Sequence, residues 1–336
     1  MDKAETRPAS GLVDSFGRRI TYARMSVTDR CDLRCRYCMA ERMQFLPRRE
    51  ILTLEELALL GDILIARGVR KIRLTGGEPL VRKGMMELVR MLGRRLGNGL
   101  DELALTTNAT RLERFASELR DAGVERVNVS LDSRRPERFA HITRGGDLGQ
   151  VLRGIDAALK VGLQVKINMV ALATINEDEI EDMMRWCAAM AIDLTLIETM
   201  PLGEVEEDRT DHYLPLDVVR RRIEECFTLV PSSRRSGGPA RYFDVTELRS
   251  RLGLITPLTN NFCDGCNRIR VAATGSVYGC LGHDQKVELR DALRSSGGAG
   301  AVDELLDRLL AGKPRRHDFR IGGAPAVARH MSVTGG

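Results

Sequence analysis

Six short apolar runs rich in Val, Ile and Leu alternate with helical patterns over the first two thirds of the chain, and this alternation restricts the possible folds more than any other feature. Strands are predicted at 24–28, 71–75, 102–106, 126–131, 164–170 and 193–198. Helices are predicted near 53–67, 84–96, 111–122, 150–161, 176–190 and 215–226. Strands separated by helices usually pair in parallel as βα units. The pattern therefore predicts an α/β fold with a parallel sheet.

Polar side chains lie at or near the carboxyl ends of five of these strands. They are Arg73 and Thr75, Thr106 and Asn108, Ser130 and Asp132, Lys166 and Asn168, and Glu198. Side chains two positions apart share one face of a strand, and a ring of polar groups at this end is typical of barrels that hold their chemistry there. The sequence thus favours a partial (βα)6 TIM-like barrel. An open doubly wound sheet is the alternative, because periodicity does not distinguish the two.

The pattern changes after residue 230. A loop at 231–240 is followed by short strand-like runs at 241–245, 252–256, 268–273 and 276–280, and by a helix near 302–311. We therefore expect a barrel region, 1–230, and a small C-terminal α+β addition, 231–336, with mainly antiparallel strands. By position alone the last six residues, M-S-V-T-G-G, would be a frayed tail.

Composition excludes several classes of protein. The net charge of +5 is too diffuse for nucleic acid binding, and no apolar stretch approaches the roughly 18 residues of a membrane span. The polar N-terminus lacks the apolar core of a secretory signal. These features predict a cytoplasmic protein, in which eight cysteines are expected to be metal ligands or buried thiols rather than disulfides.

Six of the cysteines form two triplets, one at Cys31, Cys35 and Cys38 and the other at Cys263, Cys266 and Cys280. Cys187 and Cys226 stand alone within helical patterns, and we expect both to be small buried hydrophobic side chains.

The first triplet has no fourth cysteine or histidine near it in the sequence. Thiolates are soft ligands for zinc, copper(I) or iron–sulfur clusters, and structural zinc is almost always closed by four protein ligands. Three thiolates therefore indicate a [4Fe–4S] cluster with one iron left open for another ligand.

The second triplet allows two interpretations. His283 completes a C-x2-C-x13-C-x2-H pattern, which is a credible zinc site. Alternatively, the three cysteines hold another cluster with an open iron. Arg268 and Arg270 share one face of the strand after Cys266, and two guanidinium groups beside a cluster would form an anion clamp.

Three motifs together resemble the radical S-adenosylmethionine (SAM) superfamily: C-x3-C-x2-C after the first strand, G-G-E at 76–78 and N-V-S-L-D at 128–132. Within it, the second triplet and R-I-R at 268–270 resemble the GTP 3′,8-cyclase family, which begins molybdenum cofactor synthesis. Further matching stretches are S-V-T-D-R-C at 26–31, K-I-R-L-T-G-G-E-P-L at 71–80, L-T-T-N at 105–108 and the terminal Gly335–Gly336. Because His283 is not in the family pattern, the zinc interpretation becomes the minor one.

The resemblance implies a lyase with SAM and two [4Fe–4S] clusters, the second of which binds the guanine base. A 5′-deoxyadenosyl radical would take the C3′ hydrogen of GTP, and the new carbon radical would attack C8, giving (8S)-3′,8-cyclo-7,8-dihydroguanosine 5′-triphosphate. No catalytic residue is expected beyond the ligands of the clusters and the cofactor.

The resemblance also assigns residues. The six triplet cysteines are the metal ligands, and the expected SAM contacts are Tyr37, Gly77, Ser130 and Met200. The expected GTP contacts are Arg24, Arg73, Thr106, Lys166, Arg268, Ile269 and Arg270. The terminal Gly335–Gly336 would reach the active site. Family members commonly carry Pro and Gly where this chain has Ala40 and Ala109.

Two alternatives stay open: another radical SAM enzyme with an auxiliary cluster, such as a peptide-modifying one, and a binding protein with structural metals. As partners, the resemblance implies an external electron donor and a downstream cyclic pyranopterin monophosphate synthase that uses the product. It leaves a homodimer open.

Overall fold

The computed structural model describes residues 11–203, 205, 210–296, 298–322 and 325–335. Its strands form one mixed sheet in the order β12-β11-β10-β1-β2-β3-β4-β5-β6-β9-β8-β7. The strands are β1 (Tyr22–Ser26), β2 (Lys71–Thr75), β3 (Glu102–Thr107), β4 (Arg126–Ser130), β5 (Gln164–Val170), β6 (Asp193–Ile197), β7 (Leu229–Pro231), β8 (Arg241–Val245), β9 (Ser250–Ile255), β10 (Arg268–Val271), β11 (Ser276–Tyr278) and β12 (Lys286–Glu288).

Ten α-helices occur in the described part of the chain. They are α1 (Leu54–Ala66), α2 (Met85–Gly93), α3 (Leu112–Asp121), α4 (Pro136–Thr143), α5 (Leu148–Lys160), α6 (Ile180–Ala189), α7 (Leu216–Glu224), α8 (Arg290–Arg294), α9 (Gly298–Ala311) and α10 (Met331–Thr334). Of these, α4 and α8 were not predicted, and α10 lies where position alone indicated a frayed tail.

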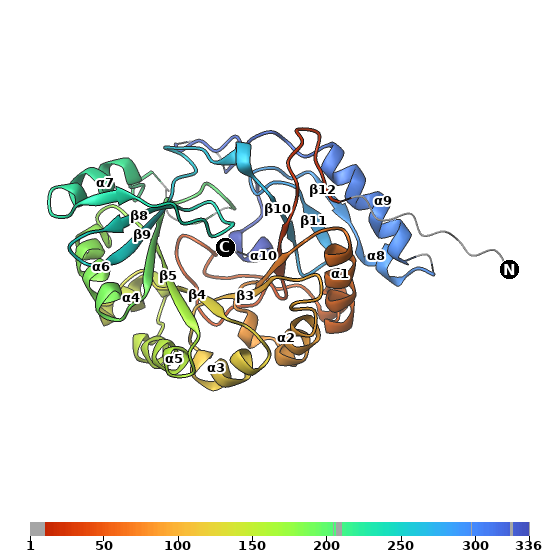
Figure 1. The fold of residues 1–336 in the computed structure, drawn as a ribbon, viewed down its shortest axis with the longest axis horizontal. Helices are drawn as coiled ribbons and strands as arrows, with labels where there is room; N and C mark the ends of the chain where they lie inside the picture. The colour runs from red at the N-terminus through yellow and green to blue at the C-terminus, as the bar shows by residue number, and fades with distance from the viewer. Residues whose placement is uncertain (1–10, 204, 206–209, 297, 323–324, 336) are drawn as a thin grey trace.

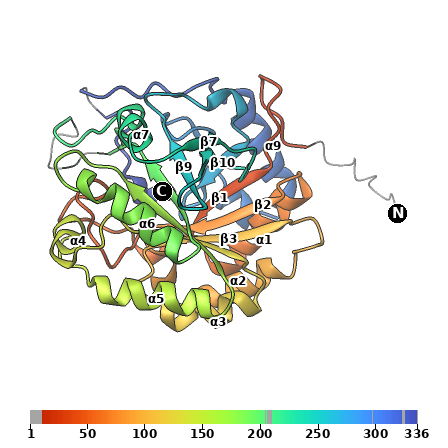
Figure 2. The same ribbon diagram turned by 60° about the vertical axis from the view of Figure 1, so that its left-hand side comes forward.

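The sheet confirms the predicted α/β partial barrel. Strands β1 to β6 pair in parallel in sequence order. Figure 1 shows these strands with α1 to α6 around their outer side, and Figure 2 shows β1, β2 and β3 side by side. Helix α1 begins as its sequence predicts, because Thr53 and Glu56 form the reciprocal hydrogen bonds of a capping box.

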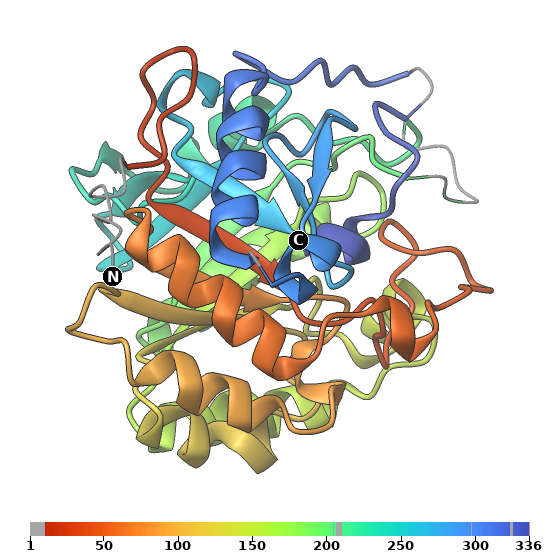
Figure 3. The same ribbon diagram turned by 90° about the vertical axis from the view of Figure 1, so that its right-hand side faces the viewer.

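The C-terminal strands pair with one another in antiparallel fashion, as expected: β7 with β8, β8 with β9, β10 with β11, and β11 with β12. They do not form a separate sheet, however. Strand β10 pairs in parallel with β1, and β9 pairs in parallel with β6, so the C-terminal region extends the barrel sheet at both edges. Helices α8 and α9 lie beside α1 (Figure 3), where Arg67 pairs with Asp303 at 2.8 Å.

Alternation along the strands gives the sheet two different buried faces. On β2, Ile72 and Leu74 belong to the hydrophobic core under the outer helices. Arg73 lies between them in sequence and points to the opposite face, where it lines a cavity. The core therefore lies between sheet and helices, and the inner face of the sheet is left for polar side chains.

The two lone cysteines differ from each other. Cys187 on α6 is buried as expected, whereas Cys226 is exposed. Cys226 lies two residues beyond Glu224, the last residue of α7, where the helical periodicity that predicted its burial no longer applies. No helix in the described part of the chain is long and apolar enough to cross a membrane.

Candidate active site

The first cysteine triplet lies in the loop that follows β1, and the G-G-E loop packs directly against the start of this loop. The backbone N–H groups of Gly77 and Glu78 donate to the carbonyl oxygens of Thr28 and Arg30 at 2.9 and 2.8 Å. A Cβ atom at Gly77 would lie 2.3 Å from the Arg30 oxygen. Glycine is required there because the two backbones approach more closely than any side chain allows.

The Glu78 side chain joins this loop to the third strand. Its carboxylate accepts hydrogen bonds from Thr107 Oγ1 at 2.8 Å and from the Asn108 N–H at 2.6 Å. The side-chain amide of Asn108 in turn points to Cys31 Sγ at 3.7 Å. The G-G-E and L-T-T-N stretches that were singled out in the sequence thus form one support for the first triplet.

The thiols of the first triplet fit an iron–sulfur cluster better than a single ion. Burial raises the pKa of Cys31 to about 12 and that of Cys35 well above its ordinary value, so thiolates form here only with a cationic centre. Within the described residues, no three His, Cys, Asp or Glu side chains converge on a site for one ion. Three thiols with no fourth cysteine or histidine near them in the sequence fit a centre that keeps one position open for another ligand.

Tyr37, between Cys35 and Cys38, is tied to the end of β4. Its hydroxyl donates to Asp132 Oδ2 at 2.6 Å, and Asp132 Oδ1 accepts from the Val170 N–H at 2.8 Å. Burial raises the pKa of Asp132 to about 6, although these two hydrogen bonds act in the opposite direction. The carboxylate therefore joins three elements at the carboxyl end of the sheet.

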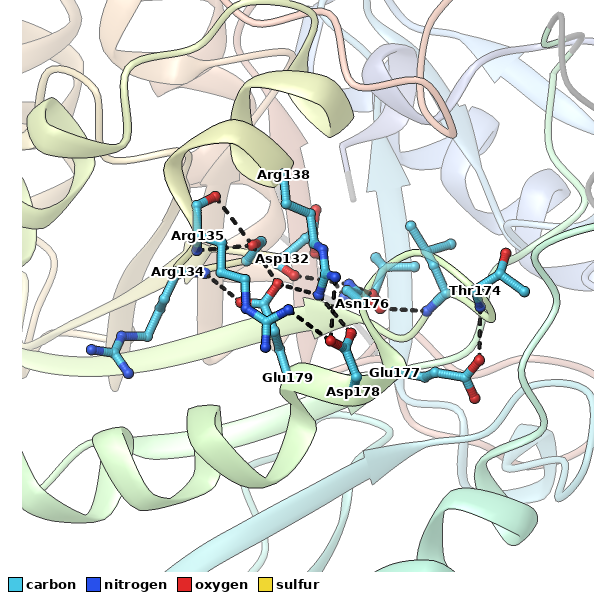
Figure 4. A network of polar contacts seen from close by, with 12 residues as sticks. Asp132, Arg134, Arg135, Arg138, Thr174, Asn176, Glu177, Asp178 and Glu179 are labelled. Carbon is cyan, nitrogen blue, oxygen red and sulfur yellow. Dashed lines mark hydrogen bonds and ion pairs between the residues drawn. The ribbon is translucent and has the colours of Figure 1, made fainter.

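The segment before α6 supports Asp132 from behind, as Figure 4 shows. The side-chain amide of the fully buried Asn176 donates to the carbonyl oxygens of Asp132 and Val170 at 2.8 and 2.9 Å. Glu179 accepts from Ser133 Oγ at 2.7 Å and from the Arg134 N–H at 3.0 Å. Sequence reasoning missed both side chains, for which N-E-D-E at 176–179 is the only local signal.

The other predicted SAM contacts lie at the same end of the barrel. Ser130 is the last residue of β4, and Met200 follows β6 and lines the central cavity. Glu198, although part of the predicted polar ring, is fully buried and accepts backbone hydrogen bonds from Leu216 at 3.2 Å and Leu258 at 2.9 Å. Its role is to hold loops, so it does not belong to the site.

The predicted GTP contacts are largely brought together. Five cations line the central cavity: Arg24, Arg73, Lys166, Arg268 and Arg270. Thr106 is opposite the cavity-lining Asn128 in the β3–β4 register, and its Oγ1 is buried with no partner in the described structure. Ile269 points the other way, into the hydrophobic core, with 1% of its surface exposed.

These five cations have no ion-pair partner among the described residues. Burial, with the charges of Arg73 and Arg126, lowers the pKa of Lys166 to about 7. Burial and repulsion by Arg268 lower the pKa of Arg270 to about 10. Burial would raise the pKa of Tyr22, but Arg73, Arg24 and other neighbouring cations lower it to about 8. The cavity therefore carries uncompensated positive charge that favours a polyanion.

The second triplet borders the same cavity. Lys313, a buried residue after α9, donates to Cys266 Sγ at 3.5 Å. Burial raises the pKa of Cys266, but Arg268 and Lys313 lower it to about 7. His283 instead faces the Arg316 carbonyl oxygen at 3.1 Å, so the four-ligand zinc interpretation is not supported. Lys313 lies in a loop without any periodic pattern, and sequence reasoning missed it.

The C-terminal end reaches the barrel. Figure 1 shows it near the middle of the molecule, and a Cβ atom at Gly335 would lie 2.2 Å from the Thr75 side chain at the end of β2. The tail is thus packed on β2, the strand that contributes Arg73 to the cavity. Gly336 lies outside the described residues.

Comparisons with known proteins agree with this arrangement. Residues 25–187 match the Radical SAM superfamily, and residues 192–319 match Molybdenum Cofactor Synthesis C. The GTP 3′,8-cyclase of Rhizobium meliloti (strain 1021) is 57% identical over 100% of this chain and 99% of its own length. That of Brucella ovis is 55% identical over 98% of this chain and 97% of its own.

Solved structures show the same fold at low identity. Streptococcus suis SuiB bound to S-adenosylmethionine has a TM-score of 0.58 at 14% identity, covering 94% of this chain and 77% of that one. The structure of anSMEcpe with bound AdoMet has the same TM-score and identity, covering 88% and 92%.

The parallel partial barrel, with a thiol triplet after its first strand, defines a radical SAM protein. Its cofactors are SAM and iron–sulfur clusters. Within this class, the chain belongs to the GTP 3′,8-cyclase family.

Proposed function

We propose that the chain converts GTP into (8S)-3′,8-cyclo-7,8-dihydroguanosine 5′-triphosphate, the first step of molybdenum cofactor biosynthesis. The observation that carries this proposal is the group of five unpaired cations in a cavity bordered by three cysteines. Burial, with the positive charges of Arg73 and Arg126, lowers the pKa of Lys166, and the negative charges of a triphosphate would favour its charged form.

Two [4Fe–4S] clusters are part of the proposal, one held by Cys31, Cys35 and Cys38 and the other by Cys263, Cys266 and Cys280. When bound, the first cluster and SAM supply a carbon radical that removes the C3′ hydrogen of the ribose. The protein holds the reactants in register and keeps competing water out.

The SAM side is formed by Tyr37, Gly77, Ser130 and Met200. Gly77 offers only backbone, since no side chain fits beside Arg30. The Tyr37 hydroxyl is already bound to Asp132 at 2.6 Å, so we assign the Tyr37 contact to its backbone. Asn176 and Glu179 keep the Asp132 loop in place from behind.

The GTP side is formed by the five cations and Thr106. Guanidinium groups bind phosphate oxygens in a forked, bidentate geometry, which suits Arg268 and Arg270 on one face of β10. Lys166 acts as a point charge, and the Thr106 hydroxyl gains a partner it otherwise lacks. Ile269 is limited to a backbone contact because its side chain is in the core.

The test uses oxygen-free protein reconstituted with iron and sulfide. We expect about eight irons per chain and, with SAM, a reductant and GTP, the formation of 5′-deoxyadenosine together with the cyclised nucleotide. Equal 5′-deoxyadenosine yield without GTP would contradict the assigned substrate. Zinc at the C-terminal triplet would contradict the second cluster.

The remaining parts of the proposal concern context. The barrel region comprises 1–230 and the auxiliary-cluster region 231–336, which contribute the first and second triplets. An external one-electron donor reduces the protein, and a cyclic pyranopterin monophosphate synthase uses the product.

All eight cysteines are free thiols, which favours a reducing, cytoplasmic location. A homodimer is the state to test by sedimentation.

A further inference from the structure

His317 lies beside the second triplet, in an aromatic group at one end of the central cavity. Its ring stacks on Phe319 with centroids 4.2 Å apart and meets Phe262 edge-on at 6.4 Å. All three rings line the cavity together with Cys263. Nothing in the sequence singles out His317, which lies in a loop after α9.

The hydrogen-bonding state of the His317 ring follows from its neighbours. The Phe319 N–H donates to Nδ1 at 3.3 Å, so a neutral ring carries its proton on Nε2. A protonated ring would also carry a proton on Nε2, so this nitrogen is a donor in either state. Nε2 is buried and has no partner in the described structure. A buried donor without an acceptor is destabilising, because it has lost its hydrogen bonds to water without a replacement.

The two ends of the cavity differ in chemistry. Arg24, Arg73 and Lys166 provide charge from the barrel strands. The aromatic group provides flat apolar surface and the Nε2–H donor of His317, and the Arg268 guanidinium lies 5.5 Å from the centroid of its Phe262 ring. GTP has the same division, with an anionic triphosphate and a flat base. One edge of guanine presents two acceptors, O6 and N7.

We propose that His317 is a substrate-specificity residue whose Nε2–H donates to the O6/N7 edge of guanine, with the base against the aromatic group of Phe262, His317 and Phe319. The inference rests on the proposed function, because it assumes that GTP occupies this cavity. It gives the buried donor its missing acceptor and places the base beside the second triplet. Pyrimidine nucleotides lack an equivalent edge and fill less of the aromatic surface.

The test measures nucleotide affinity in oxygen-free, cluster-loaded protein by equilibrium dialysis. His317→Phe keeps the stacking surface and removes the donor, so GTP should bind about tenfold more weakly, with unchanged iron content. His317→Gln restores an N–H donor and should recover part of the loss. His141→Phe, the same substitution at an exposed position on α4, is the matched control and should bind GTP like the unaltered protein.

Nucleotide analogues identify the acceptor. We would measure 7-deaza-GTP, which lacks N7, and the triphosphate of 2-aminopurine riboside, which lacks O6. In the unaltered protein at least one analogue should bind about tenfold more weakly than GTP, and that loss should shrink in His317→Phe, since the same contact is already gone.

Each outcome decides a separate point. Failure of the unaltered protein to bind GTP would overturn the proposed function and this inference with it. If GTP binds, but the loss of affinity from His317→Phe adds in full to the loss from each analogue, the two changes remove different contacts. In that case only this inference is wrong. If His317→Phe fails to retain iron, the analogues still decide the matter, because equal affinity of the unaltered protein for GTP and both analogues would exclude the contact.

Discussion

Lys313 Nζ lies 3.5 Å from Cys266 Sγ, and the same nitrogen donates to the carbonyl oxygen of Gly279 at 2.5 Å. Gly279 immediately precedes Cys280, so one buried ammonium joins the two separate parts of the second triplet. Arg18 adds a related contact, because its Nη1 donates to the carbonyl oxygen of Cys263 at 2.9 Å. Cys263 and Cys266 thus each accept a hydrogen bond from a cation in another part of the chain, and Cys280 directly follows Gly279, which does the same.

The first prediction concerns this ammonium. Lys313→Met should make the midpoint potential of the second cluster more negative, because reduction adds negative charge where a positive charge and a hydrogen bond to sulfur have been removed. If the ammonium stabilises the reduced cluster over the oxidised cluster by about 1.4 kcal/mol, its removal lowers the midpoint potential by about 59 mV for a one-electron couple. Redox titration followed by electron paramagnetic resonance measures the shift. The first cluster is an internal control, and the exposed Lys286→Met is the matched variant. An unchanged second potential would contradict the prediction.

The second prediction is a pH dependence of GTP binding that depends on Lys166. Its pKa is lowered to about 7, so the ammonium is charged below that pH and neutral above it in the nucleotide-free protein. GTP favours the charged form. Affinity should therefore weaken as pH rises from about 7 to 9, and Lys166→Arg, which stays charged, should flatten this part of the profile. Equilibrium dialysis at several pH values measures it.

Tyr22 provides the control for that experiment. Its pKa is lowered to about 8, so its deprotonation would also weaken binding of an anion at high pH. Tyr22→Phe removes this contribution and should leave the change near pH 7 in place. A profile that is abolished by Tyr22→Phe and unaffected by Lys166→Arg would assign the titration to the phenol instead.

The third prediction tests the contact between the two loops under the first cluster. In Gly77→Ala the new Cβ would lie 2.3 Å from the Arg30 oxygen and 2.9 Å from the Asp29 oxygen. The backbone must move, which typically costs about 1–3 kcal/mol of stability. We expect loss of iron from the first cluster alone, from about eight to about four per chain, and a lower Tm.

Gly300→Ala is the matched control. A Cβ there meets nothing within 4 Å, and the residue lies within α9, where Ala is favoured over Gly by about 1 kcal/mol. This variant should keep all its iron and melt at the same or a slightly higher temperature. Equal iron loss in both variants would show that the close approach at Gly77 is not the cause.

Periodicity was sufficient to predict the parallel barrel strands, because each has apolar residues packed under the helices; the choice of a barrel over an open sheet came from the polar residues at the strand ends. The limits of β2 and β5 agree with prediction, since apolar runs flanked by turn signals mark their ends. In contrast, β7 and β12 are three residues long and too short to show a period. The parallel pairing of β10 with β1 joins segments far apart in sequence, and no local pattern encodes it.

The candidate site divides in the same way. The cysteines and the cavity arginines lie in recognisable motifs, whereas Lys313 and His317 lie in an irregular loop whose position depends on tertiary packing. Ala109 stands where family members commonly have Gly, and the structure explains that preference: its φ is 63°, in the left-handed region that costs a residue with a Cβ roughly 1–2 kcal/mol. Ile269 came from the resemblance alone, and strand alternation already places it opposite to Arg268 and Arg270.

The last prediction concerns Arg270, whose guanidinium has no ion-pair partner among the described residues and whose Nε is buried without a hydrogen-bond partner. Its pKa is lowered to about 10 by burial and by repulsion from Arg268, which means that the fold carries a charge it does not stabilise. Arg270→Met keeps the apolar stem and removes the charge. We expect the nucleotide-free protein to melt a few degrees higher, while GTP binds about tenfold more weakly. Thermal melts with and without GTP measure both effects, and Arg153→Met on the outer face of α5 is the control. A lower Tm without nucleotide, or undiminished GTP affinity, would show that Arg270 serves the fold rather than the triphosphate.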